Sequence, residues 1–274
     1  MREPETPGGA APDSGASAGA HGALAIAGAP KASFVVPAPL RRRFGDDVDE
    51  IVWVNEVGGV TVRANLGGRA VYAKWAPPGS ELDLAAEVPR LRWAAAHVVV
   101  PEVIDFTSDA DGEVLITAAL PGQNAVSETW RSRPERAVRA LGSGLRALHD
   151  ALPTDSCPFS WSATERIART RAEGTPERVA ALSRLPAAPS IDRLVVCHAD
   201  ACAPNTLLAD DGSMAGFVDL GRLGVADRWA DIAIGAWSTE WNYGRGYAEL
   251  YYESYGVRPD AERIAFYRAL WDAS

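Results

Sequence analysis

The sequence predicts an α+β fold with two lobes, a strand-rich N-terminal lobe followed by a mainly helical C-terminal lobe. From about residue 51 the chain consists of short apolar runs separated by pairs of glycines, which is typical of an antiparallel sheet. From about residue 134 the apolar residues recur at helical spacing. With 274 residues, 47% of them hydrophobic, the chain can bury a sizeable core. We expect the lobes at residues 32–120 and 121–274.

Five strands are expected in the N-terminal lobe, because five short apolar runs lie between turn residues. These runs are residues 51–54, 60–64, 70–75, 98–100 and 114–117. Gly58-Gly59 and Gly67-Gly68 separate the first three runs, so these should form an antiparallel sheet with glycine turns.

Four helices are expected from apolar residues that share one helical face. They cover residues 82–97, 134–152, 227–240 and 260–271. Pro89 interrupts the first of these patterns. Since proline removes a backbone hydrogen bond, that helix should begin near Pro89 or bend there, with Glu87 on its first turn. Pro121-Gly122 marks residues 118–124 as a linker between the lobes.

The C-terminal lobe carries the residues expected to do chemistry. Asp200 follows an apolar strand at residues 194–197, Asn205 lies five positions later, and Asp219 opens a D-x-G. The spacing from Asp200 to Asn205 is that of a protein-kinase catalytic loop. In phosphoryl transfer from ATP, one carboxylate accepts the proton of the attacking hydroxyl, while an amide and a second carboxylate hold Mg²⁺. The sequence therefore predicts Asp200 as the base, and Asn205 and Asp219 as the metal ligands.

Lys74 is the second informative residue, because it is one of two lysines among 27 basic residues and stands inside an apolar strand. A compact ammonium suits contact with nucleotide phosphates. The alternative is an edge lysine that prevents strand pairing. Glu87 is the expected partner of Lys74, with Glu81 and Asp83 as substitutes, although Glu87 could also be a solvated helix residue.

Other residues near these positions have weaker signals. Gly58 and Gly59 could let the backbone approach the phosphates, or could serve only as a turn. Arg222 could support Asp219 or contact a phosphate. His198 should brace the loop backbone, and Asp231 should tie its helix to the catalytic loop. The remaining expectations are a helix cap at Asp227, packing roles for Trp237, Trp241 and Tyr243, and a disfavoured zinc site at Cys197, His198, Asp200 and Cys202.

Composition restricts the class of protein. The net charge is −9 and no basic stripe is present, which disfavours nucleic-acid binding. No apolar run is long enough to span a membrane. Three cysteines favour a reducing cytoplasm over a disulfide framework. Residues 1–31 are rich in glycine, alanine, proline and serine and lack the pattern of a signal peptide, so we expect a disordered tail.

From about Trp53 onward the chain resembles the aminoglycoside phosphotransferase family, which has a kinase-like fold. The likeness is densest at residues 195–205 and 216–233, and is closest to 3′-phosphotransferases of the kanamycin type and to streptomycin 3″-phosphotransferases. It implies ATP and Mg²⁺, Asp200 as the base, Asn205 and Asp219 as the metal ligands, and Lys74 paired with Glu87 at the nucleotide. It also implies a cationic aminoglycoside substrate, with drug amines near Glu240, Asp272 and the carboxylate of Ser274.

The chain departs from the family pattern at three places. Ala199 replaces the usual glycine after the histidine, and the segment between Cys157 and Asp192 is short and lacks an acidic patch. The sequence also ends in Trp271-Asp272-Ala273-Ser274 instead of in an acidic and diaromatic ending. Other acceptors therefore stay open: streptomycin, another amino sugar, or a small alcohol. A nucleotide-binding pseudo-kinase is the alternative from another class. We expect a monomer or a weak dimer.

Overall fold

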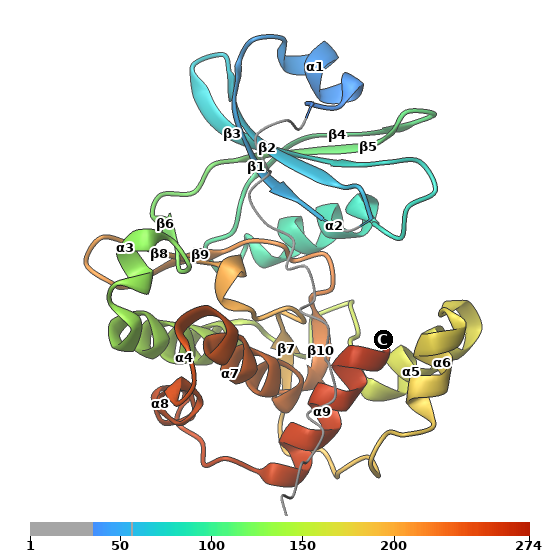
Figure 1. Cartoon of the computed structure of the whole chain (residues 1–274), viewed down its shortest axis with the longest axis vertical. Coiled ribbons are helices and arrows are strands. Elements are labelled where there is room, and N and C mark those ends of the chain that lie inside the picture. Colours follow the sequence, from blue (N-terminus) through green and yellow to red (C-terminus); the bar gives the residue numbers. More distant parts are fainter. Residues whose placement is uncertain (1–34, 56) are drawn as a thin grey trace, which may run out of the picture.

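The computed structural model describes residues 35–55 and 57–274, and the tail expected at residues 1–31 lies outside them. A strand-rich lobe sits above a larger, mainly helical lobe (Figure 1). The predicted α+β, two-lobed, kinase-like fold is confirmed. No helix among the described residues is both long and apolar enough to cross a membrane.

The upper lobe is built on one five-stranded antiparallel sheet. Its strands are β1 (Val48–Val54), β2 (Val60–Leu66), β3 (Arg69–Ala76), β4 (Val103–Asp109) and β5 (Gly112–Ala118). They lie in the order β1-β2-β3-β5-β4. Four of the five predicted strands are present. The strand expected at residues 98–100 is wrong: three consecutive valines directly before Pro101 give no alternation, and they link a helix to β4 instead.

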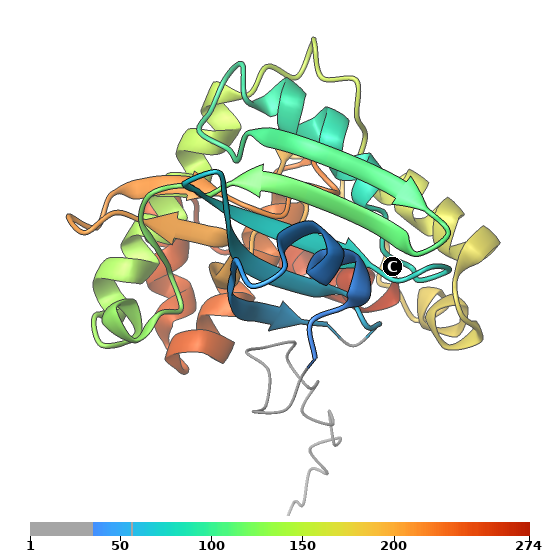
Figure 2. The same ribbon diagram turned by 90° about the horizontal axis from the view of Figure 1, so that it is seen from above.

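The two faces of this sheet contribute to different cores. Val71 and Ala73 of β3 face a small outer core that α1 (Ala38–Phe44) covers (Figure 2). Successive strand residues point to opposite faces, so Lys74 points inward, toward α2 (Leu84–Ala94). Helix α1 was not predicted, because seven residues with three arginines show little periodicity. The alternation places the β3 lysine between the lobes and not at a sheet edge.

Helix α2 determines where Glu87 lies. The Asp83 side chain accepts a hydrogen bond from the Ala86 N–H at 2.8 Å, and the helix begins at Leu84. Pro89 stays inside the helix, which therefore begins before the proline and not at it. Glu87 is on the first turn, as expected, and Leu84 and Leu91 on the same helix are buried in the core that continues into the lower lobe.

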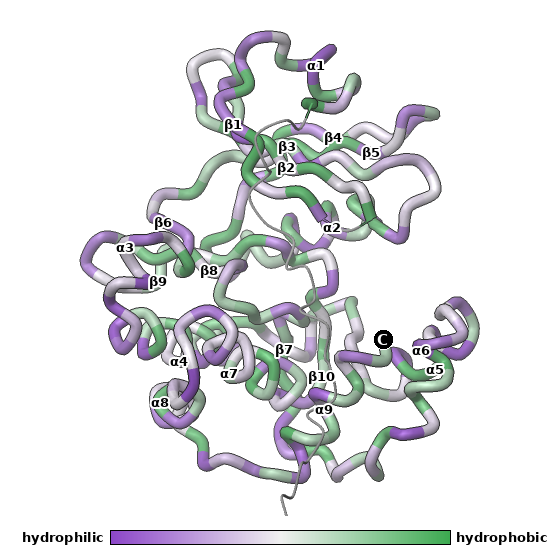
Figure 3. The backbone as a smooth tube through the Cα atoms, in the orientation of Figure 1, coloured by the Kyte–Doolittle hydropathy of each residue, from purple (hydrophilic) through white to green (hydrophobic). Residues whose placement is uncertain are grey.

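The lower lobe consists of helices around short strands. The helices are α3 (Glu128–Arg131), α4 (Pro134–Ala151), α5 (Ala163–Glu173), α6 (Pro176–Leu182), α7 (Trp229–Tyr243), α8 (Tyr247–Tyr255) and α9 (Ala261–Ala273). The predictions for α4, α7 and α9 are confirmed to within a few residues. The mainly polar α5, the seven-residue α6 and the tyrosine-rich α8 were not predicted, because hydrophilic and hydrophobic residues are mixed along them (Figure 3).

Short strand pairs carry the catalytic segment. β7 (Leu194–Cys197) pairs antiparallel with β10 (Gly224–Asp227), and β8 (Thr206–Leu208) pairs with β9 (Met214–Phe217). β6 (Gln123–Asn124) pairs with β8, so part of the predicted linker is a strand. Both loops that hold the predicted acidic residues therefore emerge from paired strands.

Candidate active site

The loop that carries Asp200 follows β7 directly. Asn205 lies in a 3₁₀ turn (Ala203–Asn205) and donates from Nδ2 to the Asp200 carbonyl oxygen at 3.0 Å. The Asp200 N–H donates to His198 Nδ1 at 3.2 Å. The loop thus folds back on itself and brings Asn205 beside Asp200.

Asp231 of α7 holds the base of this loop. Its Oδ2 accepts from the His198 N–H at 2.6 Å, and its Oδ1 accepts from the Ala199 N–H at 2.8 Å. His149 Nε2 lies 3.0 Å from Oδ2, and His149 Nδ1 lies 2.8 Å from the Tyr255 hydroxyl. Burial acts to raise the pKa of Asp231, but the hydrogen bonds and charge of His149 outweigh it and lower that pKa. The expected tie between Asp231 and the catalytic loop is confirmed.

The expected cap at Asp227 needs a correction. Asp227 ends β10 and does not lie on the same helix as Asp231. Its Oδ1 nevertheless accepts from the Trp229 N–H at 2.9 Å, at the start of α7, while its Oδ2 accepts from the Asp192 N–H at 2.7 Å. The carboxylate therefore joins the beginning of the helix to the segment before β7.

His198 joins the two acidic loops. Its Nε2 lies 2.9 Å from the Val218 carbonyl oxygen, so this nitrogen carries the proton, and its ring packs on Phe217. The bracing role expected for His198 is confirmed. Asp219 follows Val218 with φ at +64°, and Ala199 follows His198 with φ at +71°. Both loops therefore contain a non-glycine residue in the left-handed region, which costs about 1–2 kcal/mol each.

Lys74 joins the upper lobe to the D-x-G loop. Its Nζ lies 2.9 and 2.8 Å from the two carboxylate oxygens of Glu87, and it also contacts the Asp219 carboxylate. Glu87 accepts a further hydrogen bond from the Leu220 N–H at 3.3 Å. Burial lowers the pKa of Lys74, but the charges of Asp219 and Glu87 more than compensate and raise it. The predicted pairing of Lys74 with Glu87 is confirmed.

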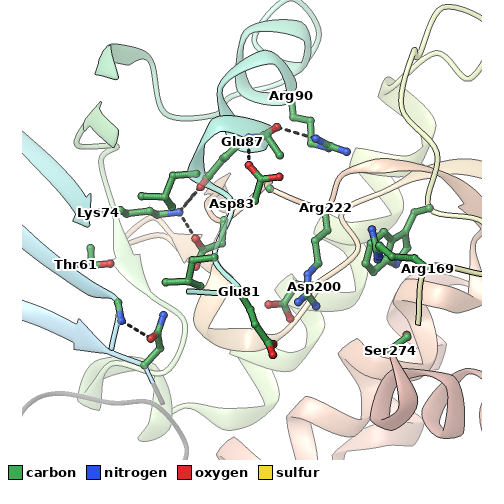
Figure 4. Close-up of a pocket in the computed structure, with 18 of the residues that line it drawn as sticks. Thr61, Lys74, Glu81, Asp83, Glu87, Arg90, Arg169, Asp200, Arg222 and Ser274 are labelled. Carbon is green, nitrogen blue, oxygen red and sulfur yellow. Dashed lines mark hydrogen bonds and ion pairs between the residues drawn. The ribbon is translucent and has the colours of Figure 1, made fainter. Parts of the chain in front are cut away.

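These side chains border one cleft of about 690 Å³ between the lobes. Lys74, Glu87, Asp200 and Asp219 line it (Figure 4). Gly59 lines it as well, where an added Cβ would come within 2.4 Å of Leu82 Cδ1. Four residues on which phosphoryl transfer was predicted to depend, from both lobes, are thus brought together, whereas Asn205 is buried behind Asp200 and is not among the lining residues.

The predicted substrate residues are only partly brought to this cleft. Ser274 lines it, and its hydroxyl accepts from Arg166 Nη2 at 2.8 Å. Glu240 on α7 and Asp272 on α9 are not among the lining residues. Gly58 is not among them either and forms a turn with φ at +86°. The lower wall instead contains residues that the sequence analysis had not singled out: Trp161, Arg169, Thr170, Glu173 and Arg178.

The disfavoured zinc group is not assembled. Among the described residues, the side chains close enough to share an ion are His149, Cys197 and Asp231, all buried. His149 and Asp231 already bond to each other, and burial raises the pKa of the Cys197 thiol well above its usual value. We therefore assign this cluster to the support of the catalytic loop.

A paired lysine, a D-x-G aspartate and a loop aspartate on one cleft between a sheet lobe and a helical lobe define a phosphotransferase of the kinase-like class. The chain belongs to the phosphotransferase enzyme family, whose model matches residues 57–267. It is accordingly an enzyme that transfers phosphate to a hydroxyl group.

Relatives of two kinds are similar to this chain. An aminoglycoside 3′-phosphotransferase of Streptomyces fradiae is 37% identical over 73% of this chain and 83% of its own length. A streptomycin 3″-kinase of Streptomyces griseus is 34% identical over 79% and 88%. The solved aminoglycoside 3′-phosphotransferase of type VIII has a TM-score of 0.71 at 28% identity, covering 86% of this chain and 97% of that one.

Proposed function

We propose that this enzyme transfers the γ-phosphoryl group of ATP to a hydroxyl of an aminoglycoside and so confers resistance. The observation that carries the proposal is the convergence of Lys74, Asp219 and Asp200 on one cleft. A related phosphotransferase of Streptomyces rimosus, solved with ADP and streptomycin, supports it; that enzyme has a TM-score of 0.62 and 28% identity over 85% of this chain.

Lys74 would contact the nucleotide phosphates. Its ammonium is held by two oxygens of Glu87 and its side chain is 17% exposed, so it is already positioned when nucleotide arrives. A positioned charge avoids the entropy cost of ordering a free lysine. Gly59 lines the same end of the cleft, where the Leu82 and Asn55 side chains occupy the space that a Cβ would take. Gly58 would contribute through the turn that places Gly59.

Asn205 and Asp219 fit a Mg²⁺ site. The Asn205 Nδ2 is committed to the Asp200 carbonyl, which leaves its amide oxygen as the ligand atom. The Asp219 side chain is 51% exposed and lines the cleft. Oxygen ligands of this kind are those that Mg²⁺ prefers, and the bound ion would neutralise charge on the phosphates.

Asp200 would act as the general base. Burial raises its pKa, and the charge of Asp219 adds to the rise, while a hydrogen bond from Cys202 opposes it. A carboxylate with a raised pKa is a better proton acceptor, so it would take the proton of the acceptor hydroxyl as the oxygen attacks phosphorus. Asp231 and His198 would keep Asp200 in place through the loop backbone.

The relatives differ in the hydroxyl that their names give as the phosphate acceptor, 3′ or 3″. The Streptomyces fradiae 3′-enzyme and the streptomycin 3″-kinase are 37% and 34% identical to this chain, a difference too small to choose between their acceptors. We take the 3′-hydroxyl of kanamycin-type drugs as the first acceptor to test and streptomycin as the second. The lobe boundary at residues 120 and 121 and the monomeric or weakly dimeric state stay predictions.

The test is ATP turnover by purified protein over kanamycin, neomycin and streptomycin, with and without Mg²⁺. Turnover should need both drug and Mg²⁺, and Asp200→Asn should reduce kcat by roughly 10²–10⁴-fold while ADP binding is retained. Asp210→Asn, an exposed loop aspartate, is the matched control and should be active. If no aminoglycoside stimulates ATP consumption, the proposed acceptor is wrong. If Asp200→Asn turns over at the wild-type rate, its assignment as the base is wrong.

A further inference from the structure

Helix α2 of the upper lobe is bonded to the D-x-G loop at two points. The Glu87 carboxylate accepts a hydrogen bond from the Leu220 N–H at 3.3 Å, and Arg90 Nε donates to the Leu223 carbonyl oxygen at 2.9 Å. Residues three apart on a helix share one face, so the same side of α2 holds both ends of residues 220–223. The upper lobe is therefore attached to the loop that carries the metal-binding aspartate.

The segment that α2 holds is a closed turn. The Leu223 N–H donates to the Leu220 carbonyl oxygen at 3.0 Å, and both leucine side chains are fully buried. An added Cβ on Gly221 would lie 3.7 Å from the Glu87 Cβ, so the turn packs directly on the helix. Asp219 immediately precedes this turn. The position of the Asp219 carboxylate therefore depends on where α2 holds the turn.

Arg90 makes the firmer of the two attachments. Its bond to the Leu223 carbonyl has the ordinary length, whereas the bond from the Leu220 N–H to Glu87 exceeds the usual limit of about 3.2 Å. Glu87 is also committed to Lys74, whose Nζ lies 2.9 and 2.8 Å from its two carboxylate oxygens. The attachment of the turn to α2 therefore depends mainly on Arg90.

The Arg90 side chain is itself held in place between the lobes. Its Nη1 donates to the Ala86 carbonyl oxygen at 2.8 Å, and its Cζ lies 4.7 Å from the centre of the Phe159 ring, which belongs to the lower lobe. Figure 4 shows Arg90 on the far side of Glu87 from Lys74. From this place Arg90 would act on the nucleotide end through the turn and not by contact with a phosphate.

The backbone at Asp219 needs support on both sides. Its φ of +64° lies in the left-handed region, where a non-glycine residue stays only if neighbouring contacts hold it. On one side, His198 Nε2 donates to the Val218 carbonyl oxygen at 2.9 Å. On the other side, the support is the turn that Arg90 and Glu87 hold. Loss of the Arg90 bond would free that side and let the Asp219 carboxylate spread over more positions.

We propose that Arg90 is a positioning residue for the Mg²⁺ that accompanies the nucleotide. It holds the turn against α2 through the Leu223 carbonyl and so keeps the Asp219 carboxylate where the ion needs it. Mg²⁺ demands near-ideal octahedral geometry, so a ligand that spreads over several positions weakens the site. The inference rests on the proposed function, because Asp219 is the metal ligand proposed there.

The test is calorimetric titration of the full-length protein with ADP, once with saturating Mg²⁺ and once with EDTA. We call the factor by which Mg²⁺ tightens ADP binding the Mg²⁺ gain. Arg90→Met keeps an unbranched stem beside Phe159 but loses the donors, and should reduce the Mg²⁺ gain by about three- to tenfold, as expected for the loss of one hydrogen bond. Affinity for ADP in EDTA should change by about twofold or less.

Turnover provides a second measurement. In Arg90→Met, the Mg²⁺ concentration that gives half-maximal ATP turnover should rise by the same factor as the Mg²⁺ gain falls. The kcat at saturating Mg²⁺ should change less, because excess ion refills a weakened site. A residue that only stabilises the fold would lower the melting temperature and leave this Mg²⁺ dependence unchanged.

Three further variants locate the effect. Arg92→Met, at an exposed position on the same helix and outside the cleft, is the matched control and should leave the Mg²⁺ gain unchanged. Arg90→Lys should restore part of the gain, because an ammonium can still donate to the Leu223 carbonyl. If Arg90→Met does not fold, Phe159→Leu replaces it, since it removes the ring beside the guanidinium. It should lower the gain by about two- to threefold.

The outcomes separate this inference from the proposed function. An unchanged Mg²⁺ gain in Arg90→Met overturns the inference, and so does an equal loss of ADP affinity with Mg²⁺ and with EDTA, which would show direct contact with the nucleotide. Turnover of an aminoglycoside by the wild type would in both cases leave the proposed function intact. A reduced gain in a protein that turns over no aminoglycoside keeps the inference and refutes the proposed acceptor. A wild type whose ADP binding does not respond to Mg²⁺ refutes both.

Discussion

Replacing Asp231 with asparagine should destabilise the protein by about 2–4 kcal/mol, because its two oxygens together face three buried donors. Oδ2 receives the His198 N–H and His149 Nε2, and Oδ1 receives the Ala199 N–H. Whichever way the asparagine amide is turned, its NH₂ meets a backbone N–H. One buried donor then loses its acceptor, which costs about 1–3 kcal/mol, and the other hydrogen bonds lose the charge that strengthens them.

Urea unfolding and thermal melting measure this loss directly. A cost of this size should lower the melting temperature by roughly 5–15 °C. The turnover number should fall by about tenfold or more while the KM for ATP changes little, because the loop that places Asp200 loosens and the nucleotide end does not. Asp210→Asn is again the control. Wild-type stability in Asp231→Asn would refute the brace.

The pH dependence of the free energy of unfolding provides a second check on the role of Asp231. The folded-state pKa of Asp231 is lowered, so its contribution to stability is present above the unfolded pKa and is lost as the pH falls through the folded value. The difference in stability between wild type and Asp231→Asn should therefore be full at pH 7 and should shrink below about pH 4. A difference that is the same at pH 7 and at pH 3 would contradict this account.

Three further predictions concern residues near the base and the nucleotide. Lys74→Arg should lower kcat/KM for ATP by about tenfold or more, since a wide guanidinium does not fit between Glu87 and Asp219; full activity in steady-state assays would contradict this. Ala199→Gly should be more favourable than Ala233→Gly by about 1–2 kcal/mol in urea unfolding, because Ala199 has φ at +71° while Ala233 is a buried helical residue; equal costs would show no strain at Ala199. Cys202→Ala should move the acid limb of the kcat/KM profile to higher pH, because the thiol lowers the raised pKa of Asp200 and the base must be ionised; Cys202→Ser should keep the limb near its wild-type position, and an unmoved limb in Cys202→Ala would show that the thiol does not act on Asp200.

The parts of the site that could be predicted from sequence are those whose chemistry is local. Asp200 and Asn205 are five residues apart on a loop after a strand, so a spacing rule is enough to pair them. Lys74 was found because a lysine in an apolar strand is unusual in this chain, and Glu87 because the first turn of the next helix is within reach of that strand. Each of these inferences needed one strand or one turn and no knowledge of how the lobes close.

The prediction of the drug-binding residues relied on family likeness, and here the structure departs from it. Glu240 and Asp272 were expected near drug amines, but the lining of the cleft includes neither. The missing acidic segment before Asp192 was noticed in the sequence. Helix α5 within that segment was not predicted, because it is polar on most of its surface and its one helical signal is the capping pattern of Ser162 and Glu165.

Three arginines lie over the Trp161 ring, and their places in the chain show why such a group escapes a search along the sequence. Arg166 and Arg169 are one helical turn apart, but Arg222 lies more than fifty residues later, and Ser274 ends the chain. These residues meet because the backbone N–H of Trp161 donates a hydrogen bond to the Val225 carbonyl oxygen at 3.0 Å. This hydrogen bond holds the start of α5 against β10, just after the D-x-G loop. Lys74 lies at one end of the cleft and Arg222 reaches toward Asp200 (Figure 4), so a basic side chain borders the cleft near each of the two acidic loops. A phosphoryl group leaving the lysine end would therefore still face a cation on the acceptor side, where the transferred charge must finally be held.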